Sequence, residues 1–314
     1  MAKDINQVLL EMPKQIKKPN YKRGVFIVAT IFLPLLHFCV FYIYSNASSF
    51  VMMFQRYDEN NNIYWTLENF KIVIDAFKAG GIGLEAFTNT MWYFWIGIFH
   101  TLITAPIFSY FSYKNLWGDT FRRVVSAGSG LMSGVVFATI MTLYFQPGGP
   151  ISAIFTKIYG LEEPAMVLAD SRFANAGLIS MTFVLGIGMN YYIRGAMMRI
   201  PEDVIEYAQL DGVTWIQELT KIIMPMSWPT IMTLLVLQST AFLTASADVF
   251  LYTNGDYGTM TISFWLWKQQ LGASPESNSL NFACALGMTL SFVTIPIVFG
   301  LRWVLGRLQE KVEF

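Results

Sequence analysis

The chain has 314 residues, of which 54% are hydrophobic and only 13% are charged, and its mean hydropathy is +0.45. A soluble globular domain carries about 25% charged residues, so this composition argues against a cytosolic enzyme and against a disordered chain. The 21 basic and 21 acidic residues balance, which argues against a nucleic-acid-binding protein. Cys39 and Cys284 lie in separate apolar runs, which indicates small buried hydrophobes and neither a disulfide framework nor a metal site.

Six runs without Asp, Glu, Lys or Arg are long enough to cross a membrane. A membrane-spanning helix needs about 20 mostly apolar residues. Inside a bilayer the backbone must satisfy its own hydrogen bonds, so each run favours a helix. We therefore predict an all-α membrane protein with six transmembrane helices, at residues 24–55, 86–113, 124–156, 173–193, 222–247 and 280–301.

Three segments refine this reading. Residues 1–23 form a polar segment before the first helix, 24–55, which is too long for a secretion signal. The third run ends in Gln-Pro-Gly-Gly-Pro at 146–150, a helix-breaking cluster that we expect outside the bilayer. Residues 257–267 are apolar and aromatic but too few to span, so they predict an interfacial or re-entrant helix.

The placement of basic residues predicts the orientation. With six spans both termini lie on one side, and that side holds fifteen of the Lys and Arg residues against six on the other. Cytoplasmic loops carry the excess of Lys and Arg, so the segment 1–23 and the tail 309–314 are expected in the cytoplasm.

The loop between the fourth and fifth spans carries consistent helix signals. Pro201 suits the first position of a helix, and Glu202 and Asp203 complement the dipole of its first turn. Gly212 is placed to end that helix with a positive φ, and Thr214 with Gln217 predicts a capping box for a second short helix. The spacing predicts an inward face of Val204, Ile205 and Ala208, and Pro225 and Pro229 mark the start of the fifth span.

The acids of this loop favour a protein partner. Anionic lipid attracts basic segments, whereas the loop carries five acidic side chains: Glu202, Asp203, Glu206, Asp211 and Glu218. An amphipathic connector that rests on the membrane is the alternative reading.

The same loop resembles the "EAA" loop of ABC importer permeases, which is written E-A-A-x3-G-x9-I-x-L-P. The matching residues are Glu206-Tyr207-Ala208, Gly212, Ile222 and Met224-Pro225, with Tyr207 and Met224 as mild departures and Asp211 also fitting the family. We call residues 200–225 the EAA loop. Asn89-Thr90 and Thr253-Asn254-Gly255 extend the resemblance to permeases of the maltose-transporter type, over residues 84–308.

The resemblance implies the type I permease fold and a function. This chain would be one of two permease subunits of a binding-protein-dependent sugar importer in the bacterial cytoplasmic membrane, with an ATPase dimer below and an extracytoplasmic solute-binding protein above. The chain contains no G-x-x-x-x-G-K-[ST] phosphate loop, so ATP and Mg²⁺ are expected on the ATPase and no cofactor is expected here. The ATPase-coupling residues would be Glu206, Tyr207, Ala208, Asp211, Gly212, Ile222 and Pro225.

A substrate path is predicted along the fifth span. Gln238, Ala241, Phe242 and Ala245 lie at helical spacing and offer an amide, an aromatic ring and room for a sugar, although ordinary helix packing would use the same residues. Asn190 is a further polar candidate on the fourth span. The resemblance to maltose-type permeases adds Val184, Leu185 and Gly188.

Two other functions compete with the importer. An ion-coupled secondary transporter usually carries intramembrane ionisable residues, and only Asp248 comes close, at the expected outer interface. An intramembrane serine protease would use Ser129, in the stretch 127–130, with His37 or His100 as base. Small residues that pack helices explain that stretch more simply.

The topology is open to a direct test. A single cysteine at Gln217, in a variant lacking Cys39 and Cys284, should react only with a membrane-permeant maleimide because the EAA loop is expected in the cytoplasm. Labelling of intact cells by an impermeant maleimide would contradict this orientation.

Overall fold

The computed structural model describes residues 21–307 except for 79, 117, 121–122, 125–127, 129–130, 186, 247 and 272–277, and the side chains of 21–23 and 182–189 also lie outside this description. The chain divides into two compact units, Met1–Val51 and Met52–Phe314.

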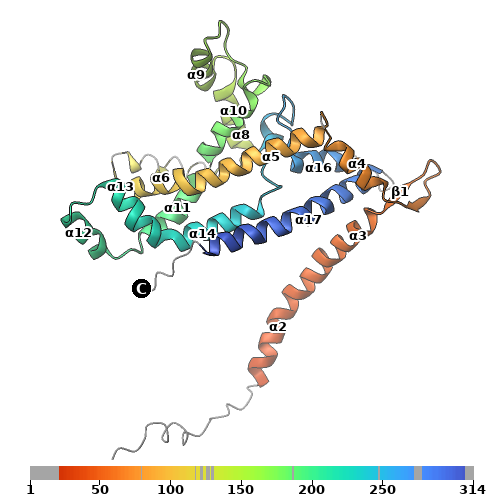
Figure 1. The fold of residues 1–314 in the computed structure, drawn as a ribbon, viewed down its shortest axis with the longest axis horizontal. Coiled ribbons are helices and arrows are strands. Elements are labelled where there is room, and N and C mark those ends of the chain that lie inside the picture. The colour runs from red at the N-terminus through yellow and green to blue at the C-terminus, as the bar shows by residue number, and fades with distance from the viewer. Residues whose placement is uncertain are drawn as a thin grey trace, which may run out of the picture. The chain divides into compact units, whose positions relative to one another are not determined.

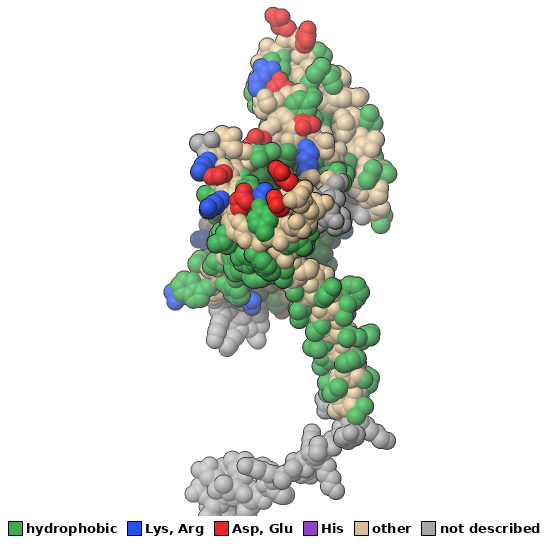
Figure 2. Space-filling model, turned by 90° about the vertical axis from the view of Figure 1, so that its right-hand side faces the viewer, with side chains coloured by type: hydrophobic (Ala, Val, Ile, Leu, Met, Phe, Trp, Pro, Cys, Tyr) green, Lys and Arg blue, Asp and Glu red, His purple; other side chains and the backbone are tan. Residues whose placement is uncertain are grey.

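The first unit is a helix with exposed apolar side chains along its length. It consists of α2 (Tyr21–Phe38), the π-helical η1 (Cys39–Tyr44) and most of α3 (Ser45–Met52). Its apolar stretch, Gly24–Met52, has 29 residues, and none of the residues in its most apolar part is buried. Figure 2 shows hydrophobic side chains along it. A long helix of this kind suits a lipid environment. It ends at Met52 and not at the predicted residue 55, because Gln55 already pairs in a strand.

Three long helices build the second unit. The first, Ile82–Tyr113, joins α5 (Ile82–Phe99), the π-helical η2 (His100–Thr104) and α6 (Ala105–Tyr113). The second, Trp215–Thr240, joins α13 (Trp215–Gln217), the π-helical η4 (Glu218–Ile223) and α14 (Met224–Thr240). The third is α17 (Asn278–Arg307).

Shorter elements complete this unit. Strands β1 (Gln55–Tyr57) and β2 (Ile63–Trp65) form an antiparallel hairpin with Arg56 opposite Tyr64. The remaining helices in the described part of this unit are α4 (Glu68–Ala76), α8 (Gly134–Phe145), α9 (Pro150–Tyr159), η3 (Val167–Ala169), α10 (Ala174–Leu185), α11 (Ile187–Met197), α12 (Glu202–Leu210), α15 (Val249–Tyr252) and α16 (Ile262–Gln270).

The helices of the second unit form a bundle with two distinct ends. Helix α14 packs against α17, α11 and α5. Figure 1 shows α12 and α13 at one end and β1, α4 and α16 at the other, and we call these the loop end and the hairpin end. One apolar cluster, around Ile193 and Ile223, includes Leu219 of the EAA loop. A second cluster, around Phe94 and Trp265, includes the residues that follow α14.

The structure confirms a helical membrane protein. Four helices in the described part of the chain are long and apolar enough to cross a membrane: Gly24–Met52, Ile82–Tyr113, Trp215–Thr240 and Asn278–Arg307. The third and fourth predicted spans correspond to the shorter helices α8 and α9, and α10 and α11. The predicted break at 146–150 is confirmed, because α8 ends at Phe145 and α9 begins at Pro150. The number of six spans stays a prediction.

The fifth predicted helix is too long. The run predicts a helix to residue 247, but α14 ends at Thr240. The hydroxyls of Ser239 and Thr240 donate to carbonyls three and four residues earlier. The amide of Ala241 then turns back to the carbonyl of Gln238, 3.0 Å away. A bond across three residues tightens the last turn, which is a common form of helix end, and the residues after it leave the helix.

The predicted helix at 257–267 begins too early. Tyr257 and Gly258 have φ angles of 57° and 75°, and such left-handed positions do not continue a right-handed helix. The chain turns through these residues, and α16 begins only at Ile262.

Candidate functional site

Helix α12 of the EAA loop is exposed on most of its surface. Glu202 and Asp203 lie in its first turn, as predicted, but Pro201 is the N-cap residue and not the first helical residue. Ile205 and Ala208 are buried. They lie on the same face of the helix, because residues three apart are neighbours on a helix surface. Val204 is exposed, so its predicted inward position is wrong: it lies at the border of that face. Among the predicted coupling residues, Glu206, Tyr207 and Asp211 are exposed.

A left-handed glycine ends α12 and reverses the chain. Gly212 has a φ of 74°. Its amide donates to the carbonyl of Gln209 at 3.1 Å, and the amide of Val213 donates to that of Ala208 at 3.2 Å. These two bonds form a Schellman motif, which confirms the predicted role of Gly212. The capping box is confirmed as well, because the Thr214 amide donates to Gln217 Oε1 at 3.0 Å and the Gln217 amide to Thr214 Oγ1 at 3.5 Å.

The second helix of the EAA loop is not separate from the fifth span. Trp215–Thr240 is one continuous helix that passes through the predicted boundary at Pro225. Proline has no amide hydrogen and its ring crowds the preceding turn. Residues Glu218–Ile223, which precede Pro225, are π-helical, and a π-helical turn accommodates the hydrogen bond that the proline cannot make. We call this continuous helix, Trp215–Thr240, the rod. Ile222, which is half-buried, and Pro225, which is exposed, both lie on it.

A desolvated ion pair joins this rod to α6. Lys114 follows the last residue of α6, and its Nζ lies 2.5 Å from Oε1 of Glu218. The Glu218 side chain is 5% exposed and that of Lys114 is 23% exposed. The ammonium also lies 5.8 Å from the ring centroids of Tyr110 and Tyr113. Sequence reasoning treated Glu218 only as one acid among five, and the ion pair depends on a partner about 100 residues away.

Residues 241–261, which we call the interrupted segment, follow α14. The described residues of this segment are non-helical except for α15. Asn89 Nδ2 donates to the carbonyls of Gly258 and Met260, at 2.8 and 2.9 Å. Thr90 Oγ1 accepts from the amide of Ile262 at 3.0 Å, and Asn175 Nδ2 donates to the Gly258 carbonyl at 2.9 Å. Buried non-helical backbone requires such partners. The Asn89-Thr90 motif thus has a physical role.

The Thr253-Asn254-Gly255 motif forms a turn in this segment. Asn254 and Gly255 have φ angles of 54° and 75°. A Cβ on Gly255 would lie 2.7 Å from the Phe264 ring, so only glycine fits. The Thr253 hydroxyl lies 2.6 Å from that of Thr259 and closes the turn.

The four residues predicted on one face of the fifth span do not share a helical face, because α14 ends before Ala241, Phe242 and Ala245. Gln238 is half-buried, and a Cβ on Gly97 of α5 would overlap with its amide nitrogen. Both Gln238 and the segment that follows it therefore face α5.

The individual substrate-path residues differ in how they are packed. Phe242 is 7% exposed and its ring meets that of Phe94 edge-on, with centroids 4.9 Å apart. Asn190 is buried on α11, and its Oδ1 has no hydrogen-bond partner in the described part of the chain. The side chains of Val184, Leu185 and Gly188 lie outside the described residues.

The two histidines considered for the protease alternative, His37 and His100, each contact a residue one turn later on the same helix. Nδ1 of His100 lies 2.6 Å from the hydroxyl of Thr104, one turn later. His37 packs on Phe41, with ring centroids 4.8 Å apart. Ser129 lies outside the described residues. Asp248 is exposed and follows the end of α14.

Comparison with known proteins decides the family. The profile of the family described as "Binding-protein-dependent transport system inner membrane component" matches residues 23–313. The chain belongs to this family. Membership makes it a membrane subunit of a transport system and not the ATPase, and it disfavours both the secondary transporter and the protease.

Two curated relatives of this transport family member carry sugar-related names. The multiple sugar-binding transport system permease protein MsmF of Streptococcus mutans is 27% identical over 200 residues, which cover 62% of this chain and 65% of that protein. The maltodextrin transport system permease protein MdxF of Bacillus subtilis is 26% identical over 178 residues, 51% of this chain and 40% of that protein. The matches thus span less than two thirds of either relative.

Solved structures share the fold. A bacterial ABC transporter that imports the acidic polysaccharide alginate has a TM-score of 0.72 at 20% identity, over 92% of this chain and 98% of that one. The same kind of transporter in complex with an alginate pentasaccharide-bound periplasmic protein has a TM-score of 0.71, also at 20% identity, over 93% and 99%. At this identity the likeness establishes the permease fold alone.

The buried ion pair predicts a stability difference. Replacing Lys114 by Ala leaves the Glu218 carboxylate buried without its cation, which costs about 3–5 kcal/mol. The thermal midpoint of the detergent-purified chain should fall by several degrees, and Lys114→Met with Glu218→Leu should recover much of the loss.

The matched control is the exposed pair Lys78–Asp75, whose side chains are 70% and 61% exposed. Lys78→Ala should cost at most about 1 kcal/mol. Equal midpoints for Lys114→Ala and Lys78→Ala would show that the Lys114–Glu218 pair does not hold the rod to α6.

Proposed function

We propose that this chain is one of two permease subunits of an ATP-driven importer in the bacterial cytoplasmic membrane. It forms half of the path for a sugar or oligosaccharide that an extracytoplasmic binding protein delivers. The observation that carries the proposal is the EAA loop: an exposed helix, a left-handed glycine turn, and then a continuous helix from Trp215 to Thr240.

The exposed surface of the EAA loop suits a groove on an ATPase subunit. Tyr207 and Leu210 on α12 are 70% and 83% exposed, and Trp215 and Ile216 beyond the turn are 53% and 54% exposed. Large apolar side chains rimmed by acids are typical of a protein-binding surface. Glu206 can there make charge-assisted hydrogen bonds with a basic residue of the ATPase.

The rod gives ATPase motion a route into the membrane. A displacement at Trp215 moves α14 with it, because the two belong to one helix. The capping box and the Lys114–Glu218 pair stabilise the first turns of that helix. The far end of α14 is the interrupted segment, where the sugar path is proposed. Coupling between two sites needs a shared element of this kind, which both sites can bias.

The orientation follows from the distribution of Lys and Arg, fifteen on the side of the EAA loop and six on the other. The loop end then faces the cytoplasm and an ATPase dimer. The hairpin end faces outward, toward the binding protein. The names of the two curated relatives support a sugar as the cargo.

The coupling role of the loop predicts the effect of two substitutions. Gly212→Val places a β-branched residue at a φ of 74°, and Glu206→Lys reverses the charge of the docking helix. Removing one partner of a desolvated charge pair costs about 2–5 kcal/mol. Both variants should lose sugar uptake into vesicles and should recover less ATPase in pull-down, while still inserting in the membrane.

Gly212→Asn is the matched control, because asparagine tolerates the left-handed conformation. It should retain most of the uptake. Normal uptake with both Gly212→Val and Glu206→Lys would leave the EAA loop as a passive connector and would contradict the proposed function.

A further inference from the structure

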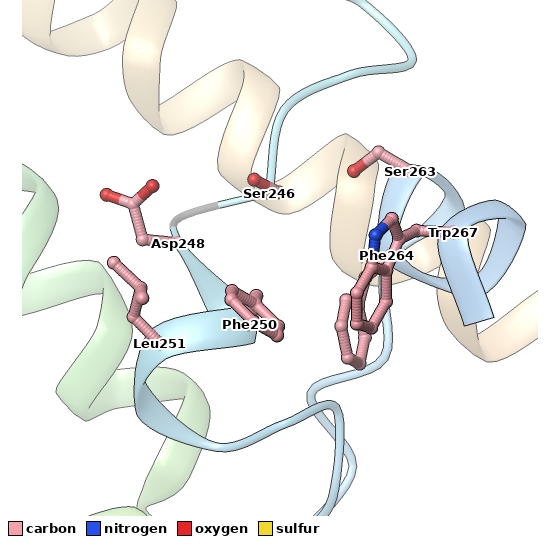
Figure 3. A pocket seen from close by; sticks show the side chains of 7 residues that line it. All are labelled: Ser246, Asp248, Phe250, Leu251, Ser263, Phe264 and Trp267. Atoms are coloured by element: carbon pink, nitrogen blue, oxygen red, sulfur yellow. The ribbon is translucent and has the colours of Figure 1, made fainter. Parts of the chain in front are cut away.

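A cavity of about 360 Å³ lies beside the interrupted segment, and none of the predicted substrate-path residues lines it. Its volume falls in the range of roughly 300–1,000 Å³ that small-molecule sites occupy. Figure 3 shows Asp248 on one side of it, the rings of Phe264 and Trp267 on the other, and Phe250 between them. The full lining is Ser246, Asp248, Phe250, Leu251, Ser263, Phe264 and Trp267.

The aromatic side of the cavity is fixed in place. The rings of Phe264 and Trp267 stack with centroids 5.4 Å apart and 19° between their planes. Phe250 meets Trp267 edge-on at 4.9 Å. Phe264 is 5% exposed, whereas Trp267 is 38% and Phe250 55% exposed, so the latter two present ring surface to a ligand. A flat, rigid aromatic surface suits an apolar flat partner, such as the C–H face of a sugar ring.

The polar side of the cavity is an acceptor. Asp248 has φ 54° and ψ 34°, a sparsely populated conformation of the kind that clusters at ligand sites. Its carboxylate forms no ion pair or side-chain hydrogen bond with any residue in the described part of the chain. An ionised carboxylate only accepts hydrogen bonds, so it pairs with hydroxyl donors and repels other carboxylates.

The nearby cation, Lys268, forms no ion pair with Asp248. Nζ of Lys268 donates to the carbonyl of Asn254 at 2.9 Å and lies 5.1 Å from the centroid of the Phe264 ring. Lys268 is absent from the residues that line the cavity. The hydroxyls of Ser246 and Ser263 add groups that both donate and accept.

We propose that this cavity binds an uncharged sugar ring and disfavours acidic sugars. Trp267 and Phe250 contact the C–H face of the ring, and Asp248 accepts from its hydroxyls. The inference rests on the proposed function and deepens it, because it adds a recognition site at the hairpin end and names the charge class of the cargo. A lipid phosphate would meet the same repulsion from Asp248 as an acidic sugar.

The test is equilibrium binding to the purified importer complex without its binding protein. The probes are maltotriose and raffinose, which are neutral, and trigalacturonate, which is acidic. Wild type should bind at least one neutral trisaccharide, and trigalacturonate about tenfold more weakly or worse. Trp267→Ala and Asp248→Asn should each weaken neutral binding by about tenfold, the usual effect of losing a charge-assisted hydrogen bond or an aromatic contact. Asp248→Asn should also narrow the gap between neutral and acidic probes.

Asp256→Asn is the matched control, because Asp256 is exposed in the same segment but does not line the cavity. The inference is overturned if no neutral probe binds, if trigalacturonate binds as well as maltotriose, or if both cavity variants bind like wild type. Sugar uptake by the wild-type complex is measured in parallel. If the complex takes up sugar but the cavity substitutions do not change probe binding, only the cavity proposal is refuted. If the purified complex contains no ATPase subunit and takes up no sugar, the proposed function is refuted.

Discussion

The need to pair every backbone polar group inside a bilayer governs this structure. Most of the chain meets it with helices, but residues 241–261 do not. The carbonyls of Gly258 and Met260 accept from the side-chain amides of Asn89 and Asn175, and the first amide of α16 donates to the Thr90 hydroxyl. The cavity that Asp248 lines lies beside this segment.

The helix Trp215–Thr240 begins in the EAA loop and ends at the interrupted segment, so it connects the two ends of the bundle. At the loop end its start is fixed by the Gly212 turn, the Thr214 capping box and the pair Lys114–Glu218. At the hairpin end it gives way to the interrupted segment. Under the proposed function, this continuous helix is the element that both ends can bias.

Local signals in the sequence were sufficient for the EAA loop. Gly212, Thr214 and Gln217 act on neighbours within a few residues, so their spacing alone predicts the turn and the cap. The end of α14 at Thr240 was not predictable in this way, since an apolar run continues to residue 247 and the segment depends on Asn89 and Asn175 far away in the chain.

The ion pair at Glu218 and the contacts between the hairpin and α17 were missed for the same reason as the end of α14. Asn278 binds both the amide and the carbonyl of Tyr57, 221 residues earlier. Glu218 meets Lys114 only in the folded chain. Side-chain partners across a bundle leave no periodic trace in sequence, whereas helix ends and apolar runs do.

The central claim is that nucleotide on the ATPase moves the far end of α14. The most direct measurement is the rate at which an impermeant maleimide labels a single cysteine at Gln238, from outside, in the assembled importer lacking Cys39 and Cys284. Trapping the ATPase with ATP and vanadate should change this rate severalfold, and Gly212→Val should remove the change. Equal rates with and without trapped nucleotide would contradict the claim.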